Sequence, residues 1–231
     1  MTIPLSPPNT QKKENVREPA GDGVKALILV GSLKPDEMES HTLALAVAVA
    51  NEMRRRGAEV DISYLPDFQI IPGVARDSGD DSDQMDEIFA QIEAADIVVF
   101  ATPIWWNQPS SYLQKVIERM TTYDDEYIES GKSDLYGKVG GCIVTGTDDG
   151  FQSCMSRFYC LFSQLGFTVP PEAFATWAGT SLADVTKNKD TREEVATMAR
   201  NLVAWANLLK DSRIGETVQE DKTGKDGILA S

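Results

Sequence analysis

DIVVFATPIWWNQPSSYLQKVIERM, residues 96–120, is the stretch that decides the fold. Residues 97–101 form an unbroken apolar run without polar alternation, which is typical of a parallel strand buried on both faces. The next segment, residues 102–108, contains a proline and an asparagine, and both residue types favour a turn. Pro109 is placed to be a first helical residue, and helical spacing of apolar residues follows up to Met120. The stretch therefore predicts a central strand, a turn at its carboxyl end and a helix.

Two tryptophans, Trp105 and Trp106, lie on this turn. Pro103 cannot donate to a strand ladder and Asn107 favours a turn, so neither ring is expected to be a strand core residue. Packing against the core is the alternative for either ring taken singly. Open parallel sheets bind ligands just outside the carboxyl ends of their strands, so we expect at least one ring to face a ligand.

Length and charge limit the classes of function. With 231 residues, of which 42% are apolar, the chain is long enough for one sizeable domain. A formal net charge of −14 argues against a nucleic-acid surface, since phosphate binding needs clustered Lys and Arg and the longest basic run is residues 54–56. The sequence has no apolar window of about 18 residues and no apolar signal core, so no membrane partner and a cytoplasmic location are expected.

Cysteine and histidine usage argues against a metal centre. Cys142, Cys154 and Cys160 are irregularly spaced and include no Cys-x-x-Cys pair, which indicates neither a disulfide framework nor a zinc or iron–sulfur site. His41 is the only histidine, so it would have to be the base of any Ser-His-Asp triad. We expect a reducing compartment and no metal.

The first half of the chain alternates strands and helices. Residues 1–23 are rich in Pro and Gly among polar residues and are expected to be a disordered tail. Residues 25–30 form an apolar run that predicts a buried strand. A helix over about 42–56 would present Leu43, Val47, Ala50 and Met53 on one face. Residues 59–64 alternate polar and apolar, which predicts an edge strand. After an irregular connection over 66–81, Ser82 is expected to cap a helix that leads into the central strand.

The second half continues this alternation. Residues 121–138 read as another irregular connection, and residues 139–145 predict a fourth strand. A helix from Phe151 would be closed by Gly166. Residues 167–169, before two prolines, predict a short fifth strand at an edge. Thr191 with Glu194 resembles a capping box for the last helix, and residues 212–231 read as a flexible tail.

Five strands with edge signatures on the second and fifth fit one arrangement. A right-handed parallel sheet in the order 2-1-3-4-5, within one α/β domain over residues 24–211, places the buried first and third strands side by side. The order reverses between these two strands. The loops over 31–42 and 102–108 flank that point, and the turn over 145–150 borders it.

The loop after the first strand predicts a phosphate site. It supplies hydroxyls at Ser32, Ser40 and Thr42, a cation at Lys34, and the positive end of a helix dipole. It contains neither a P-loop nor a G-x-G-x-x-G fingerprint, and a capped helix with nothing bound is the alternative. Together with the tryptophan turn, the loop favours a planar aromatic ligand that carries one phosphate.

These segments carry a family resemblance. Residues 102–111, TPIWWNQPSS, resemble the isoalloxazine-binding turn of the flavodoxin-like NAD(P)H-dependent FMN reductase family, and residues 31–34 and 40–42 resemble its phosphate loop. Residues 135–138 resemble the segment before its fourth strand. Asn107 stands where the family usually has a glycine, and the first loop is longer than its common form. The resemblance implies a flavodoxin-like three-layer sandwich, FMN as cofactor, and NADH or NADPH as electron donor.

The resemblance also implies which residues bind FMN, while it assigns no catalytic residue. Those around the phosphate would be Ser32, Lys34, Ser40, His41 and Thr42; those along the ring Pro103, Ile104, Trp105, Trp106, Asn107 and Gln108; and those from the fourth-strand side Thr145, Gly146, Thr147, Asp148 and Gly150.

The sequence thus predicts an FMN-dependent oxidoreductase that passes electrons from NADH or NADPH to a quinone, a free flavin or a similar small acceptor. Hydride chemistry belongs to the flavin, so the lack of a catalytic histidine is no obstacle. The alternative is a flavodoxin-type electron carrier whose acidic surface docks a basic partner. A hydrolase that uses Ser32 or Cys142 is a third reading, although neither residue lies in the loop arrangement that a nucleophile needs. The long connections and the resemblance also predict a homodimer or homotetramer.

Overall fold

The computed structural model describes residues 23–34, 39–131, 133–147 and 150–212. Its five strands are β1 Lys25–Val30, β2 Glu59–Tyr64, β3 Ile97–Pro103, β4 Val139–Gly146 and β5 Phe174–Ala178. Its helices are α1 His41–Arg54, the 3-10 turn η2 Leu65–Asp67, α2 Met85–Ala94, α3 Ser111–Arg119, α4 Thr121–Ser130, α5 Phe151–Gln164, α6 Leu182–Val185 and α7 Lys189–Ser212. The two expected tails fall outside the described residues, apart from Gly23 and Ser212.

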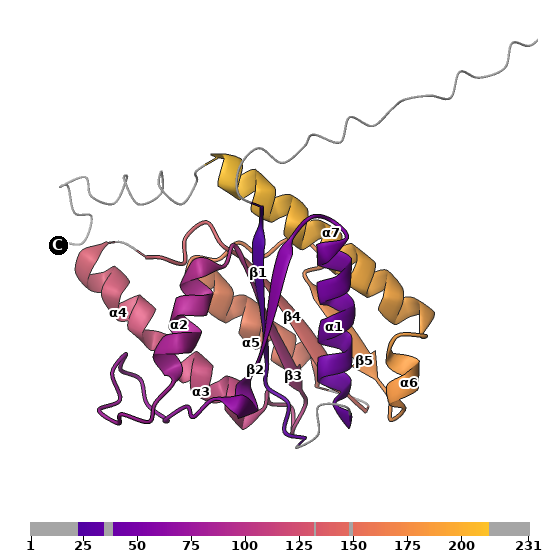
Figure 1. The fold of residues 1–231 in the computed structure, drawn as a ribbon, viewed down its shortest axis with the longest axis horizontal. Coiled ribbons are helices and arrows are strands. Elements are labelled where there is room, and N and C mark those ends of the chain that lie inside the picture. Colours follow the sequence, from indigo (N-terminus) through magenta and orange to yellow (C-terminus); the bar gives the residue numbers. More distant parts are fainter. Residues whose placement is uncertain (1–22, 35–38, 132, 148–149, 213–231) are drawn as a thin grey trace, which may run out of the picture.

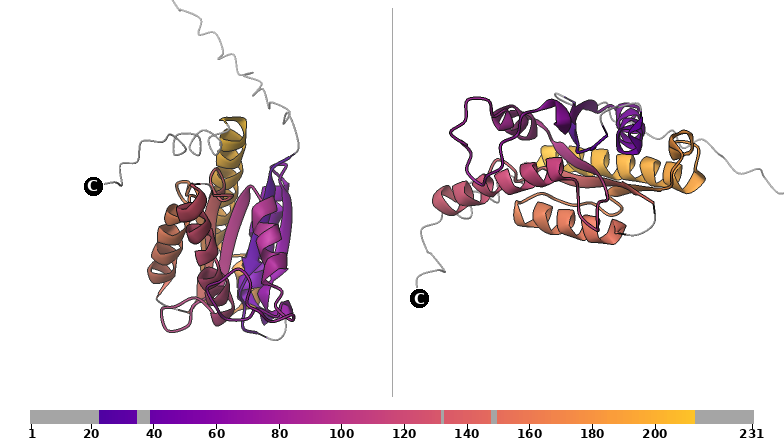
Figure 2. Two further views of the ribbon diagram at one scale, coloured as in Figure 1. Left: turned by 90° about the vertical axis from the view of Figure 1, so that its left-hand side faces the viewer. Right: turned by 90° about the horizontal axis from the view of Figure 1, so that it is seen from below.

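The strands form one parallel sheet in the order β2-β1-β3-β4-β5, which confirms the predicted topology. Helices α1, α6 and α7 cover one face, and α2, α3, α4 and α5 cover the other (Figure 1). Seen from below, α7 and α5 lie on opposite sides of the strands (Figure 2). None of the helices in the described part of the chain combines the length and the apolar content that a membrane crossing requires.

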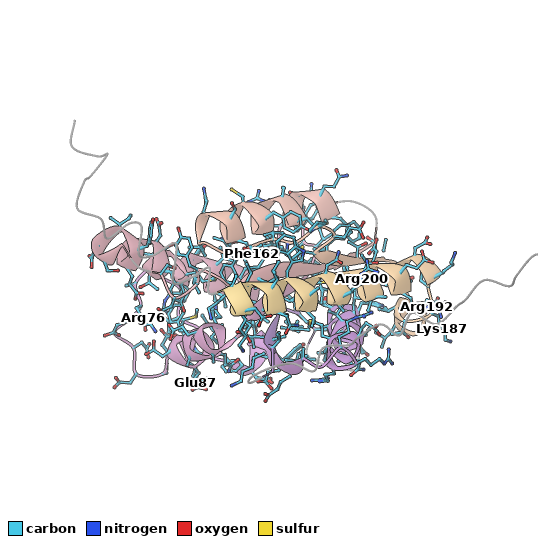
Figure 3. The ribbon with its side chains drawn as sticks, turned by 90° about the horizontal axis from the view of Figure 1, so that it is seen from above. Arg76, Glu87, Phe162, Lys187, Arg192 and Arg200 are labelled. Carbon is cyan, nitrogen blue, oxygen red and sulfur yellow. The ribbon has the colours of Figure 1, made fainter. Side chains whose placement is uncertain are left out.

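Strand β3 separates two hydrophobic cores because successive side chains of a strand point to opposite faces. Val99 and Ala101 pack into the α1–α7 core, while Val98 and Phe100 pack into the other. Phe162, labelled in Figure 3, reaches from α5 onto β4, where a Cβ added at Gly140 would lie 2.7 Å from its ring. The expected buried centre of the sheet is thus confirmed.

The predicted fifth strand over residues 167–169 is wrong. Only Thr168 pairs there, as an isolated bridge to Val139. The following prolines lack the N–H that a ladder needs, so the chain leaves the sheet and rejoins it further on. Ala173 O accepts from Cys142 N at 2.9 Å, and β5 then runs beside β4 to Ala178.

Several helix predictions are also corrected. Helix α2 begins at Met85 after Gln84, and the side chain that accepts from Met85 N, at 3.3 Å, is that of Asp83, so Ser82 is not its cap. Glu194 bonds Thr176 of β5, and Asn188 Oδ1 accepts from Thr191 N, so the expected capping box is absent. Val47, expected on the buried face of α1, is 39% exposed. The sequence of α1 is apolar around most of the helix, so its pattern does not reveal which face is buried.

A whole helix, α4, replaces part of the connection expected over residues 121–138. It is acidic on most of its surface and buries only Thr122 and Tyr123, so its apolar period is weak. Gly131 ends it with a φ of 70°, a left-handed conformation that glycine adopts at little cost.

Candidate functional site

The carboxyl ends of β1, β3 and β4 meet along one edge of the sheet, at the bottom of Figure 1. We call these ends, together with the loops that follow them, the rim. In the ladder Val30 lies beside Ala101 and Pro103 lies beside Thr145, so the three loops leave the sheet at the same level. Each of the loops predicted to bind the ligand therefore lies at the rim.

Two buried serines organise the loop after β1. Ser40 donates its hydroxyl proton to Ser32 Oγ at 2.9 Å and accepts from Leu43 N at 3.1 Å, which makes it the cap of α1. Ser32 Oγ also accepts from Lys34 N at 3.3 Å. Ser32 is the acceptor in both of these bonds, so its own proton remains available to an anion.

Lys34 brings a cation to the same loop. Its ammonium donates to Glu39 O at 2.7 Å and keeps two further protons for other acceptors. Tyr64, at the end of β2, donates its hydroxyl proton to Lys34 O at 2.7 Å and so fixes the backbone of the loop. Residues 35–38 of this loop lie outside the described part of the chain.

A hydroxyl pair joins the first turn of α1 to the end of β4. The Oγ1 atoms of Thr42 and Thr145 are 2.7 Å apart, and both residues are buried. One proton suffices for this bond, so the pair keeps a second proton to donate. Next to it, His41 Nε2 is buried and has no hydrogen-bond partner. Hydroxyls, an ammonium and the positive end of the α1 helix dipole fit a phosphate group. We call Ser32, Lys34, Ser40, His41 and Thr42 the phosphate seat.

The tryptophan turn is a two-residue hairpin. Trp105 and Gln108 exchange both backbone hydrogen bonds at 2.9 Å. The two central residues, Trp106 and Asn107, have φ values of 50° and 62°, as in a type I′ turn. Asn tolerates the left-handed region, whereas a bulky residue such as Trp occupies it only under strain.

Both rings project outward from this turn. Trp105 is 50% exposed and Trp106 is 94% exposed. Core packing is therefore excluded for Trp106, and Trp105 is only half covered. The prediction that neither ring belongs to the strand core is confirmed.

Backbone and glycine contacts hold the turn against the loop after β4. Ile104 N donates to Thr145 O at 2.8 Å, and Ser153 Oγ donates to Asn107 O at 3.0 Å. A Cβ added at Gly150 would lie 2.6 Å from Asn107 Oδ1, and one at Gly146 would lie 2.9 Å from Ile104 Cδ1. These glycines let the two loops touch, and Ile104 and Asn107 fill the space that they leave.

The helix behind the turn begins later than predicted. Ser110 caps α3 by accepting from Leu113 N at 3.3 Å, so Pro109 precedes the helix. Ser110 N also donates to Thr102 Oγ1 at 2.9 Å. A Cβ at Gly31 would lie 2.5 Å from Ser110 Oγ, so the glycine allows β1 to end directly against α3.

The nucleophiles of the hydrolase reading are not activated. Cys142 is buried in the interior of β4, away from the rim, and burial raises the pKa of its thiol. A thiol with a raised pKa is protonated at neutral pH and is a poor nucleophile. Ser32 bonds another serine and a backbone N–H instead of a base. Within the described residues, no group of three or more His, Cys, Asp or Glu side chains is placed to hold a metal ion.

The structure brings most of the predicted residues together. Those of the phosphate seat join Thr145, and the turn over 103–108 joins Gly146 and Gly150. Thr147 is exposed beside them, and Asp148 lies outside the described residues. Sequence reasoning missed Tyr64, Ser110 and Ser153, which hold these loops in place. Ser110 precedes the helical period and is recognisable as a cap, but the other two depend on which elements lie side by side.

A family model described as NADPH-dependent FMN reductase matches residues 24–180 of this chain. Among solved structures, the chain resembles RosB with the bound intermediate 8-demethyl-8-formylriboflavin-5'-phosphate, with a TM-score of 0.75, 24% identity and 90% of each chain covered. At that identity the likeness supports the fold.

Two curated proteins are similar over part of their length. A divalent metal cation transporter, MntH, of Mycobacterium bovis is 33% identical over 74% of this chain and 25% of its own length. The 8-demethyl-8-aminoriboflavin-5'-phosphate synthase of Streptomyces davaonensis is 29% identical over 68% of this chain and 64% of its own length. The chain thus spans less than two thirds of either relative.

Proposed function

Because the chain belongs to the NADPH-dependent FMN reductase family, we propose that it is an enzyme that uses FMN to pass electrons from NADPH or NADH to a quinone, a free flavin or a similar small acceptor. The family match confirms two predictions made from the sequence, the family itself and FMN as its cofactor. The observation that carries the proposal is the exposed tryptophan turn, held beside a phosphate seat at one rim.

The chain's own residues would hold and orient the flavin. The protonated hydroxyls of Ser32 and the Thr42–Thr145 pair, with the Lys34 ammonium, would bind the phosphate. The turn over residues 103–108 would lie along the ring. When bound, FMN supplies hydride acceptance and electron delivery, which leaves binding and orientation to the protein.

The turn is rigid, which suits it to orienting a planar group. Two backbone bonds close it, and a third bond, from Ile104 to Thr145, ties it to the sheet. Strained conformations of this kind persist where the surrounding structure fixes them, and they gather at functional sites. The exposed indole of Trp106 offers an apolar face at the rim, which favours flat aromatic acceptors such as quinones and flavins.

Anaerobic mixing of the FMN-loaded protein with NADPH or NADH tests the proposal. An enzyme should lose its visible flavin absorbance rapidly, and addition of a quinone or free flavin should restore it with turnover. Negligible reduction by both nucleotides would favour the electron carrier instead. Isolation of a colourless protein that cannot be reconstituted with FMN would overturn the flavin assignment altogether.

A second candidate has the flavin as substrate. It is favoured by the relative named 8-demethyl-8-aminoriboflavin-5'-phosphate synthase, whose name describes a modified riboflavin phosphate. Mass spectrometry of the flavin extracted after prolonged aerobic turnover separates the two functions. An unchanged FMN mass supports the reductase, and a changed mass supports flavin modification.

A further inference from the structure

Two buried side-chain nitrogens in the described part of the chain have no hydrogen-bond partner. They are His41 Nε2 and Trp177 Nε1. Trp177 is only 7% exposed. An indole N–H is a donor only, and buried donors in native proteins almost always have a partner. Each of these two unpaired nitrogens is therefore a candidate to bind a ligand.

Trp177 lies on the face of the sheet that carries the phosphate seat. In the β4–β5 ladder it pairs in register with Thr145, so both side chains project to the same face. Thr145 bonds Thr42 in the first turn of α1, and Trp177 packs in the core formed with α1 and α7. The indole is thus the neighbour of the threonine pair across one strand spacing.

The nitrogen-bearing edge of the indole lies at the rim. A Cβ added at Gly179 would lie 2.6 Å from Trp177 Cζ2 and 3.1 Å from Cε2, the carbon bonded to Nε1. Gly179 N in turn donates to Gly146 O at 2.9 Å. The indole therefore reaches past the end of β5 to the level of the loop that follows β4.

His41 lies on the side of α1 that faces β5. Leu43 and Val47 line a groove with Ile62 of β2 on one side of α1. His41 precedes Leu43 by two residues, which is about 200° around a helix, so it faces the opposite side. On that side α1 contacts α6 and β5, which Figure 1 shows beside the start of α1. The unpaired nitrogen of Trp177 thus lies on the side of α1 that carries the unpaired nitrogen of His41, a member of the phosphate seat.

We propose that Trp177 Nε1 donates a hydrogen bond to the phosphate of FMN, beside His41 of the phosphate seat. Strand β5 then adds a residue to a seat whose other members come from the loop after β1 and from α1, next to Thr145 of β4. The inference rests on the proposed flavin site. It makes Trp177 a residue that selects FMN over riboflavin, because riboflavin has no phosphate to receive the bond.

Trp177→Phe tests this, since the phenyl ring keeps most of the packing and removes the N–H. Affinities for FMN and for riboflavin are measured by flavin fluorescence on the apoprotein. Loss of a hydrogen bond to a charged group should weaken FMN binding by about tenfold or more, while riboflavin binding changes less than about twofold. The matched control is Trp205→Phe, on α7, where the side chain is 37% exposed and both affinities should stay unchanged.

A second measurement reads the indole directly. In protein with 15N-labelled tryptophan, the Trp177 indole resonance should shift on addition of FMN or inorganic phosphate and stay in place with riboflavin. The Trp177→Phe spectrum identifies the resonance. Should that variant fail to fold, Phe variants of Trp105, Trp106 and Trp205 identify it by elimination.

Three outcomes would overturn the inference. Equal losses for FMN and riboflavin would mean that Trp177 acts through packing. An unchanged FMN affinity of Trp177→Phe, together with an indole resonance that does not shift when phosphate is added, would mean that a water molecule accepts the N–H. Failure of the wild-type protein to bind FMN would reject the flavin site itself, a result distinct from the other two because it needs no variant.

Discussion

Trp105 and Trp106 combine exposed side chains with a backbone that the surrounding contacts hold in place. Trp105→Ala should weaken FMN binding by about 0.5–1.5 kcal/mol, roughly two- to tenfold, which is the worth of an aromatic pair beyond its area. A side chain that is 50% exposed contributes little to the core, so the urea midpoint should move only slightly. Affinity and midpoint are measured on the same sample.

Trp106→Ala is the companion variant. Because its ring is 94% exposed, stability should stay within about 0.5 kcal/mol of wild type, while reduction by NADPH or turnover of the acceptor slows. If Trp105→Ala instead costs about 3–5 kcal/mol of stability, the ring is core packing and the turn is removed from the site.

The three thiols should differ sharply in reactivity. Cys160 is exposed, whereas Cys142 and Cys154 are buried. Burial raises the pKa of both buried thiols, that of Cys154 to about 11. At pH 8 an aromatic disulfide reagent should therefore label one thiol of the native protein quickly and all three in urea. Cys160→Ser should abolish the fast phase; a fast phase that survives would contradict the buried placement.

Single residues could be predicted where the neighbouring sequence determines their conformation, and not where distant elements do. The turn at residues 102–108 is marked locally by Pro103 and Asn107, and the left-handed φ of Asn107 suits a residue type that adopts it readily. Trp177 could not be recognised. Its role depends on pairing with Thr145, and the two prolines after residue 169 concealed where the fifth strand begins.

Among the elements, α3 fastens the long connection that follows η2. Arg119 is fully buried, and its guanidinium donates to the carbonyls of Ile71, Ala75 and Arg76 at 2.9, 2.7 and 2.6 Å and to Asp83 Oδ2 at 2.6 Å. Arg119→Met orphans all four acceptors. Since breaking a buried charge network costs about 3–5 kcal/mol, we expect a loss of that order in urea unfolding, with faster proteolysis inside residues 68–84.

Lys115→Met is the control for this prediction. Lys115 also lies on α3, and it donates only to Ile70 O, at 3.1 Å. Its replacement should cost far less stability and leave the proteolysis pattern unchanged. Equal losses in both variants would show that α3 itself, and not the guanidinium, is responsible.

The elements that the sequence predicted well are those with strong periods. The bounds of β1 match the apolar run, and β3 and β4 extend the predicted strands by only a few residues. The acidic helix α4 and the short α6 bury too little to show a period, so both were missed. Helix α7 begins at Lys189, ahead of the expected cap Thr191, because Asn188 Oδ1 accepts from Thr191 N and so acts as the cap instead.

At the scale of the whole molecule, the expectation of a homodimer or homotetramer stays a prediction. The exposed Trp106 at the rim and the connection between η2 and α2 are the surfaces that we expect a second copy to cover, since the other expected connection is largely helix α4. Light scattering at micromolar concentration should give at least twice the chain mass of 25.3 kDa. A monomeric mass would contradict it.

Stability should fall at high pH. Burial raises the pKa values of Cys142, Cys154, Tyr123 and Tyr159, so the folded chain keeps protons that the unfolded chain releases. The free energy of unfolding is then fully present below the ordinary thiol pKa of about 8.5 and decreases as the pH rises through the folded values. Desolvation lowers the pKa of the partly buried Lys138, which acts in the opposite direction but is a single group.

The acid side has a different origin. Burial tends to raise the pKa of Asp83, but the hydrogen bonds from Arg119 and Ile71 N outweigh it and hold the pKa below its usual range. The stability that the Asp83 carboxylate contributes is present above its unfolded pKa of about 3.9 and is lost as the pH falls through its lower folded pKa. Urea unfolding between pH 3 and pH 11 should therefore give a plateau near neutrality with a decline on both sides. Asp83→Asn should be less stable than wild type at neutral pH and should remove part of the acid decline. Cys154→Ala should remove part of the alkaline decline. A stability curve that stays flat above pH 9 would mean that these hydroxyls and thiols have the same pKa values in the folded and the unfolded chain.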